Sequence, residues 1–140
     1  MFIHRETVQL HDTDAYGIIF FSNQLKFCHN AFQDLLETVG ERMPPSRPLS
    51  GAMLVIVHVA SDYLAPVHLG DRLSIEVAIA AFGTTSMTVH YRLANQDGRE
   101  VGRVTSVHVA IDVVSNAKAP LPARLRAALA PHLAGGDDAP

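Results

Sequence analysis

Two carboxylates lie in a short polar segment near the N-terminus, directly before an apolar run. The segment reads His11-Asp12-Thr13-Asp14-Ala15-Tyr16-Gly17-Ile18-Ile19-Phe20-Phe21-Ser22. The residues after Gly17 are too apolar for an exposed loop, so we expect them to face a pocket or a partner subunit. A helix that begins near Ser22 would present unpaired backbone N–H groups and the positive end of its dipole close to the two carboxylates.

This combination of groups suits catalysis on a carbonyl. A helix-start amide can hydrogen-bond a carbonyl oxygen as it becomes an oxyanion, and a nearby carboxylate can attack the carbon or activate water to do so. The other interpretation is an Asp-rich turn whose side chains hydrogen-bond their own backbone, which is the commoner role of an isolated Asp-x-Asp. The apolar stretch up to Phe21 favours the catalytic interpretation.

Length and composition indicate one small domain. The chain has 140 residues, of which 48% are hydrophobic, so it can bury a core. We place a single domain at residues 1–134 and a flexible tail at 135–140. The net charge of -3 and the scattered basic residues give no basis for binding nucleic acid.

The location expected for this chain is the cytoplasm. No apolar run reaches the roughly 18 to 20 residues of a membrane span, so we expect no membrane association. The N-terminus shows no secretory signal. The single cysteine, Cys28, excludes an internal disulfide, fits a reducing compartment and has apolar helical neighbours, which predicts a place in the core.

The eight histidines are dispersed and show no zinc-ligand spacing, so we expect no metal. His58 differs from the others because it lies in an apolar strand among valines. It is either an interior histidine with its hydrogen bonds satisfied or a catalytic or substrate-binding group. No Ser occurs in a G-x-S-x-G motif, which leaves serine hydrolase chemistry without support.

Hydrophobic periodicity predicts one long helix and five strands. Residues 2–10 are expected to form a strand and residues 22–39 an amphipathic helix, which Gly40 ends before a proline-rich loop over 41–51. Four strands follow, at 53–64, 72–79, 86–93 and 99–113, with a hairpin turn at Asp97-Gly98. Val104 is out of phase with Val107, Val109 and Ile111, which predicts a β-bulge around 103–105. A short helix is expected within 121–133.

This order leaves one helix and one sheet to make the core, which predicts an α+β fold with an antiparallel sheet wrapped around the helix. The sheet's exposed edges predict pairing with a second copy.

The segment from Val8 to Asn23 resembles the signature of the 4-hydroxybenzoyl-CoA thioesterase family, roughly D-x-D-x-x-G-h-h-[WYF]-[FYH]-x-x-[YFL] with h apolar. The resemblance covers nearly the whole chain and implies the hotdog fold, a five-stranded antiparallel sheet around one long central helix. Several further segments are similar to the branch acting on 1,4-dihydroxy-2-naphthoyl-CoA: Cys28-His29, Val57-His58, Asp62–Pro66, Gly70–Arg72 and Ala119–Pro122.

The resemblance implies roles for individual residues. The family's catalytic carboxylate falls on Asp14, and the residue whose backbone N–H polarises the thioester carbonyl falls on Phe21. Gly17 permits the tight turn between them, and Asp12 holds the loop. Some related thioesterases place the carboxylate on the central helix. The acids available there are Asp34 and Glu37, both late in the helix.

The same resemblance implies a substrate site. Tyr16, in place of a small residue, would narrow the acyl pocket or hydrogen-bond a substrate ring, and Ile18 and Ile19 would line that pocket. His58 is the remaining substrate-binding candidate. The turn at 81–85 has no Lys or Arg for the CoA phosphates, which leaves Arg72, Arg92, Arg99 and Arg103 as candidates.

The activity implied is hydrolysis of an acyl-CoA thioester by a homodimer or homotetramer, with no cofactor beyond the CoA of the substrate. The acyl group would be aromatic, as in 4-hydroxybenzoyl-CoA or 1,4-dihydroxy-2-naphthoyl-CoA. Two alternatives stay open: a hotdog enoyl-CoA hydratase or dehydratase, and a non-catalytic acyl-binding module.

Overall fold

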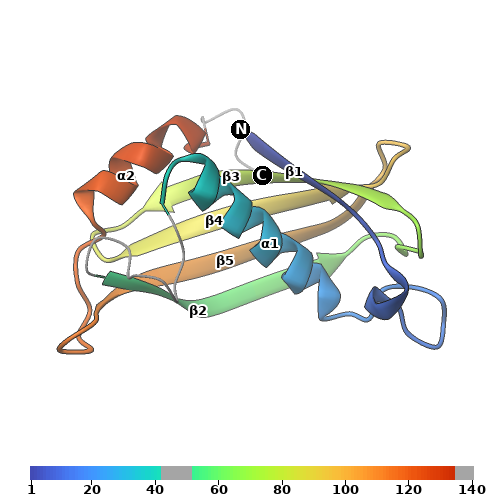
Figure 1. Cartoon of the computed structure of the whole chain (residues 1–140), viewed down its shortest axis with the longest axis horizontal. Helices are drawn as coiled ribbons and strands as arrows, with labels where there is room; N and C mark the ends of the chain where they lie inside the picture. Colours follow the sequence, from blue (N-terminus) through green and yellow to red (C-terminus); the bar gives the residue numbers. More distant parts are fainter. Residues whose placement is uncertain (42–51, 135–140) are drawn as a thin grey trace.

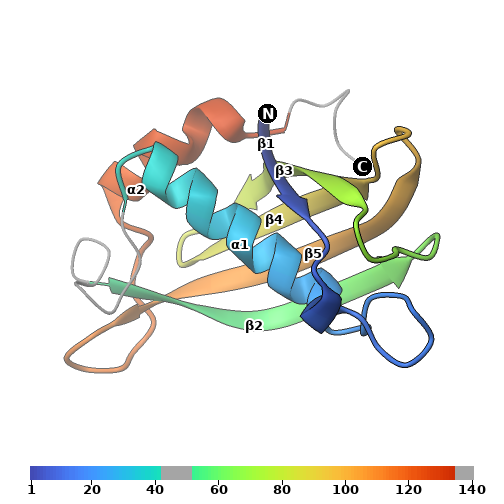
Figure 2. The same cartoon turned by 45° about the vertical axis from the view of Figure 1, so that its right-hand side comes forward.

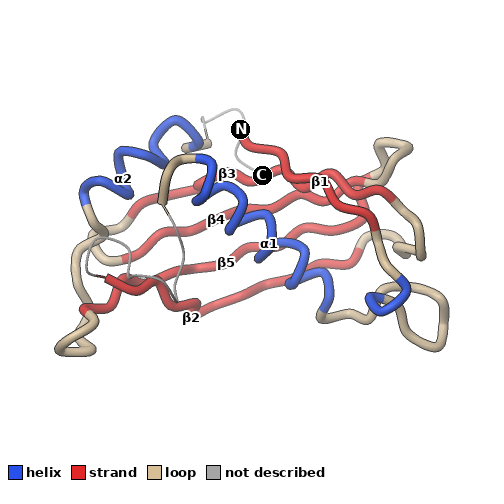
Figure 3. The backbone as a smooth tube through the Cα atoms, in the orientation of Figure 1, coloured by secondary structure: helices blue, strands red, loops and turns tan. Residues whose placement is uncertain are grey.

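The computed structural model describes residues 1–41 and 52–134, which form five strands and two α-helices (Figure 1, Figure 3). Two 3₁₀ turns lie at Leu10–Asp12 and Ala130–His132. The tail predicted at 135–140 and the loop predicted after Glu41 lie outside the described residues. The elements are β1 (Phe2–Thr7), α1 (Asn23–Thr38), β2 (Ala52–Tyr63), β3 (Arg72–Phe82), β4 (Ser86–Ala94), β5 (Glu100–Asp112) and α2 (Ala123–Leu129).

The strands form one antiparallel sheet in the order β1-β3-β4-β5-β2. Figure 2 shows α1 lying across one face of this sheet, with β1 and β2 at its two edges. The predicted α+β architecture, a sheet wrapped around one long helix, is therefore confirmed. None of the helices in the described part of the chain is long and apolar enough to cross a membrane.

The helix α1 is held by its apolar face. Phe27, Phe32, Leu35 and Leu36 are fully buried against the sheet, and burying such side chains stabilises a fold by about 1.5–3 kcal/mol each. Cys28 is buried among them, as predicted.

The end of α1 is set by Gly40. This glycine has a φ of 86°, donates its N–H to the Glu37 carbonyl at 3.1 Å and lets Glu41 N–H reach the Leu36 carbonyl at 2.7 Å. These bonds satisfy the last helical carbonyls, which confirms the predicted cap.

The first strand is shorter than predicted, whereas the short C-terminal helix is confirmed. β1 stops at Thr7 because Asp12 closes a 3₁₀ turn. The Asp12 N–H donates to the Gln9 carbonyl at 3.0 Å, and Oδ2 of Asp12 accepts the Gln9 N–H at 2.8 Å. The short helix expected within 121–133 is α2. A 3₁₀ turn follows it, where Pro131 has no N–H to continue an α-helix.

The β-bulge expected around 103–105 is wrong in position. In the pairing of β4 with β5, Leu93 lies opposite Gly102 and Ala94 opposite Glu100, so the extra residue is Val101. A second irregularity leaves Val57 of β2 without a partner on β5. The alternation of buried and exposed side chains along β5 therefore changes phase at Val101, before the position that the valine pattern suggested. After it, the buried face of β5 carries Val104, Ser106, His108 and Ala110.

Candidate active site

The loop after β1 presents Asp14 in a tight turn. Oδ1 of Asp14 accepts the backbone N–H of Tyr16 at 2.8 Å. The Asp14 carbonyl accepts the N–H of Gly17 at 3.1 Å, and Asp14 N–H donates to the Ile18 carbonyl at 2.9 Å. Gly17 has a φ of 79°, a conformation that a residue with a Cβ rarely adopts, so the tight turn predicted there is confirmed. Among the described residues, Oδ2 of Asp14 has no hydrogen-bond partner.

The chain then enters α1 through two phenylalanines. Phe20 N–H donates to the Asp12 carbonyl at 2.9 Å, and the Phe20 carbonyl accepts the N–H of Asn23 at 2.8 Å. The N–H of Phe21, between them, has no acceptor in the described part of the chain. This is the unpaired amide that the start of a helix offers to a ligand oxygen.

Asp14 and Phe21 line the same cavity, which has a volume of 460 Å³. Its wall is mostly apolar and is built from the Asp14 loop, the first turn of α1 and the segment after β2. A cavity of this size and character is typical of small-molecule sites. The lining residues are Asp14, Ile18, Ile19, Phe20, Phe21, Gln24, Tyr63, Leu64, Ala65, Pro66 and Val67.

The structure gathers four of the seven site residues expected from the sequence: Asp14, Ile18, Ile19 and Phe21. The other three do not line this cavity in the single chain. Tyr16 projects into solvent with 89% of its surface exposed, and Gly17 sits in the turn beside it.

His58 is exposed on β2, opposite Val107 in the pairing with β5. The interior position considered for it is therefore wrong for the single chain. The valine-rich pattern around His58 suggested a buried strand, but β2 is an edge strand of the sheet.

Two polar residues of the cavity wall were not identified from the sequence. Gln24 is 1% exposed and donates through Nε2 to Ser61 Oγ and to the Asp62 carbonyl, each at 2.9 Å. Tyr63 donates its hydroxyl to the Phe21 carbonyl at 2.7 Å. Both tie the start of α1 to β2. The sequence did indicate that Gln24 is buried, because it lies four residues before Cys28 on the apolar face of the helix.

The acidic residues late in α1 do not reach this cavity. Asp34 accepts a hydrogen bond from His4 Nδ1 at 2.8 Å, across to β1. Glu37 is exposed and contacts Gln33. Of the carboxylates considered from the sequence, the structure therefore places only that of Asp14 at this cavity.

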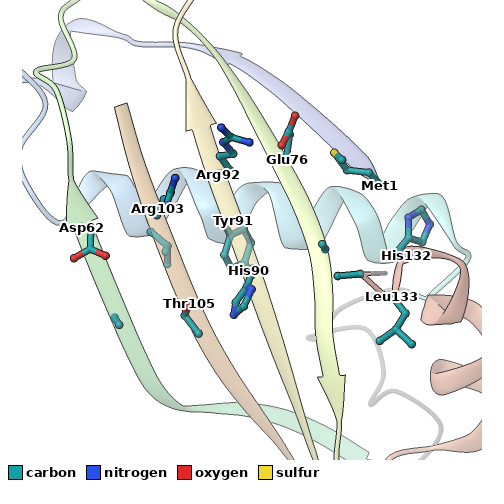
Figure 4. Close-up of a pocket in the computed structure, with 14 residues that line it drawn as sticks. Met1, Asp62, Glu76, His90, Tyr91, Arg92, Arg103, Thr105, His132 and Leu133 are labelled. Carbon is teal, nitrogen blue, oxygen red and sulfur yellow. The ribbon is translucent and has the colours of Figure 1, made fainter. Parts of the chain in front are cut away.

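A second cavity of 540 Å³ lies on the other face of the sheet (Figure 4). Its residues on β2, Ala60 and Asp62, alternate with Ser61 and Tyr63, which contact α1 and its entry. His90 and His132 also line it, and desolvation by burial lowers the pKa of each.

Arginines are prominent in this second cavity. Arg92 and Arg103, two of the candidates for binding the CoA phosphates, line it and both form ion pairs with Glu100. The carboxylates that line this cavity, Asp62 and Glu76, come from strands β2 and β3 and not from the entry of a helix, so we place the candidate active site at Asp14.

A long helix wrapped by a five-stranded antiparallel sheet is the architecture of the hotdog fold. A family model described as the thioesterase-like superfamily matches residues 8–129, and the chain belongs to this superfamily. The family resemblance seen in the sequence is thereby confirmed, and the protein is a thioester hydrolase.

Named relatives agree with this assignment. The chain is 30% identical over 119 residues to a 1,4-dihydroxy-2-naphthoyl-CoA hydrolase from Thermosynechococcus vestitus, covering 85% of this chain and 82% of the relative. It superposes with a TM-score of 0.86 on the crystal structure of a 1,4-dihydroxy-2-naphthoyl-CoA thioesterase from Synechocystis, at 28% identity and 92% and 95% coverage of the two chains. A gentisyl-coenzyme A thioesterase gives a TM-score of 0.79 at 25% identity, with 91% and 98% coverage.

Proposed function

We propose that this protein hydrolyses an aryl-CoA thioester to a carboxylic acid and free CoA, with Asp14 as the reacting carboxylate. One observation carries the proposal. Asp14 and Phe21 line a single apolar cavity, and the Phe21 N–H has no acceptor among the described residues. The thioester oxygen would accept that N–H and keep the hydrogen bond as it gains charge.

Asp14 has two chemical routes. In the first, its carboxylate attacks the thioester carbon, the carbon–sulfur bond breaks, CoA leaves as a thiolate, and water then hydrolyses the mixed anhydride. In the second, Asp14 removes a proton from a water molecule as the water adds to the same carbon, and the tetrahedral intermediate expels the thiolate. Oδ2 of Asp14, which has no hydrogen-bond partner among the described residues, could act in either route.

The proposed acyl group is aromatic and planar, such as 1,4-dihydroxy-2-naphthoyl or a smaller hydroxylated aryl group. Phe20 and Phe21 place two rings at the cavity, with centroids 4.8 Å apart, and Tyr63 supplies a third ring. Relatives acting on naphthoyl and gentisyl thioesters support the same class. We expect kcat/KM to favour aryl-CoAs over long-chain acyl-CoAs by about tenfold or more, a difference of ~1.4 kcal/mol.

We also propose a homodimer, or a tetramer of such dimers, with the cavity at the subunit boundary. β2 pairs with β5 on one side and lies at the sheet edge on the other. Ile56, Val57 and Val59 are exposed along it, and the strand leads into the cavity wall at Tyr63 and Leu64. A second copy paired along β2 would cover this apolar surface and close the cavity.

The decisive experiment is a panel of acyl-CoAs followed by thiol release, with Asp14→Asn beside the wild type. This substitution keeps the shape and removes the charge, so kcat should fall by about 10² or more, as for loss of a positioned general base. Glu37→Gln, on the exposed face of α1, is the matched control and should retain activity. Hydration of an enoyl-CoA without thiol release would instead indicate a hydratase, and unchanged acyl-CoA an acyl-binding module.

A further inference from the structure

The loop that carries Asp14 is fastened to α1 through a buried charge on Asp12. The side chain of Asp12 is only 3% exposed. Its Oδ2 accepts the Gln9 N–H at 2.8 Å, and its Oδ1 pairs with Nζ of Lys26, which reaches it from α1. A carboxylate removed from water costs free energy unless a cation and hydrogen bonds compensate. Lys26 supplies that cation.

The backbone of Asp12 contacts the same end of the helix. Its carbonyl accepts the Phe20 N–H at 2.9 Å and the side-chain Nδ2 of Asn23 at 2.8 Å. Phe20 directly precedes Phe21, the proposed oxyanion donor, while Asp14 follows two residues after Asp12. One residue therefore links the loop of the reacting carboxylate to the amide that would face it.

We infer that Lys26 is a positioning residue, which acts through Asp12 to fix the separation between the Asp14 carboxylate and the Phe21 N–H. The inference rests on the proposed function. Lys26 does not line the cavity, and its ammonium is engaged by Asp12. Misplacing a reacting group by about 1 Å can lower an enzymatic rate by about 10², so loss of this tether should lower kcat.

The tether also predicts a pH effect. Lys26 faces Asp12 from α1, and His11 lies on its own segment with Nε2 3.8 Å from Oδ1. Desolvation favours the neutral carboxyl, but the hydrogen bonds from Lys26 and Gln9 outweigh it and hold the pKa of Asp12 below its usual range. Removing Lys26 takes away its hydrogen bond and its positive charge, both of which lower this pKa, so Asp12 should protonate at a higher pH than in the wild type.

The test compares Lys26→Met with Lys26→Arg and with Arg124→Met. The control removes a cation from a similarly buried acid at the far end of α1, where Arg124 Nε lies 3.0 Å from Oε1 of Glu41. Lys26→Met should lower kcat about tenfold or more, leave KM within about twofold and move the acid limb of the kcat profile to higher pH. Lys26→Arg should restore most of kcat. Arg124→Met should lower the melting temperature without changing kcat.

A Lys26→Met variant that melts earlier yet keeps the wild-type kcat and pH profile would overturn the inference, because Lys26 would then only stabilise the fold. A wild type that hydrolyses no acyl-CoA would instead reject the proposed function. In that case hydrogen exchange at the Phe20 amide still tests the tether. Faster exchange in Lys26→Met, but not in Arg124→Met, supports it, and unchanged exchange rules it out.

Discussion

Mild acid is predicted to weaken the fold through one buried histidine, His108 on β5. The residue is 2% exposed, and its ring stacks on Phe32 with ring centroids 4.5 Å apart and has Nε2 2.9 Å from Ser106 Oγ. Desolvation by burial, with a smaller contribution from the charge of His29, lowers the pKa of His108 from 6.5 to about 4.

The shift fixes both the sign and the size of the effect. Below pH 6.5 the unfolded chain binds a proton at His108, whereas the folded protein binds it only below about pH 4. The unfolded state therefore binds more protons in this window, and stability falls as the pH falls. The loss is absent well above the unfolded pKa, reaches about 2 kcal/mol near pH 5 and levels off at about 3 kcal/mol below the folded pKa.

Urea unfolding at about pH 8 and about pH 5 measures this loss, with His108→Gln beside the wild type. The glutamine keeps a polar group near Ser106 but does not titrate. The wild type should lose about 2 kcal/mol more than the variant between the two pH values. Equal losses in the wild type and His108→Gln would refute the reasoning.

Three further predictions concern the walls of the cavity and the sheet edge. In Gly102→Ala the new Cβ would lie 2.1 Å from Gln24 Oε1, so Gln24 must move; we expect a loss of about 1–3 kcal/mol in urea unfolding, and unchanged stability would contradict it. Tyr63→Phe removes the hydrogen bond to the Phe21 carbonyl, which should cost about 0.5–1.5 kcal/mol of stability and lower kcat more than it changes KM; steady-state kinetics that show only a KM effect would count against this. Val57→Lys puts a charge on the exposed edge strand, and light scattering should then report a smaller assembly than the wild type, whereas an unchanged mass would exclude β2 from the interface.

The sequence by itself determined the features that depend on neighbouring residues. The periodicity of residues 22–39 predicted α1 to within a residue at each end, and Gly40 marked its cap. The turn that holds Asp14, with Gly17 in a left-handed conformation, was also readable. These features follow from backbone preferences and short-range hydrogen bonds, which depend only on residues close together in the sequence.

Only the tertiary structure decided which distant residues complete the cavity. Gln24 and Tyr63 both line it because α1 packs across the sheet beside the end of β2, and their separation in the chain does not encode that arrangement. The bulge at Val101 and the exposed position of His58 depend likewise on strand pairing. An alternating pattern shows that two faces exist, but it does not say which face the helix covers or which strand lies at the edge. Burial is a property of the packed molecule, so the physical reason for these outcomes lies in long-range contacts.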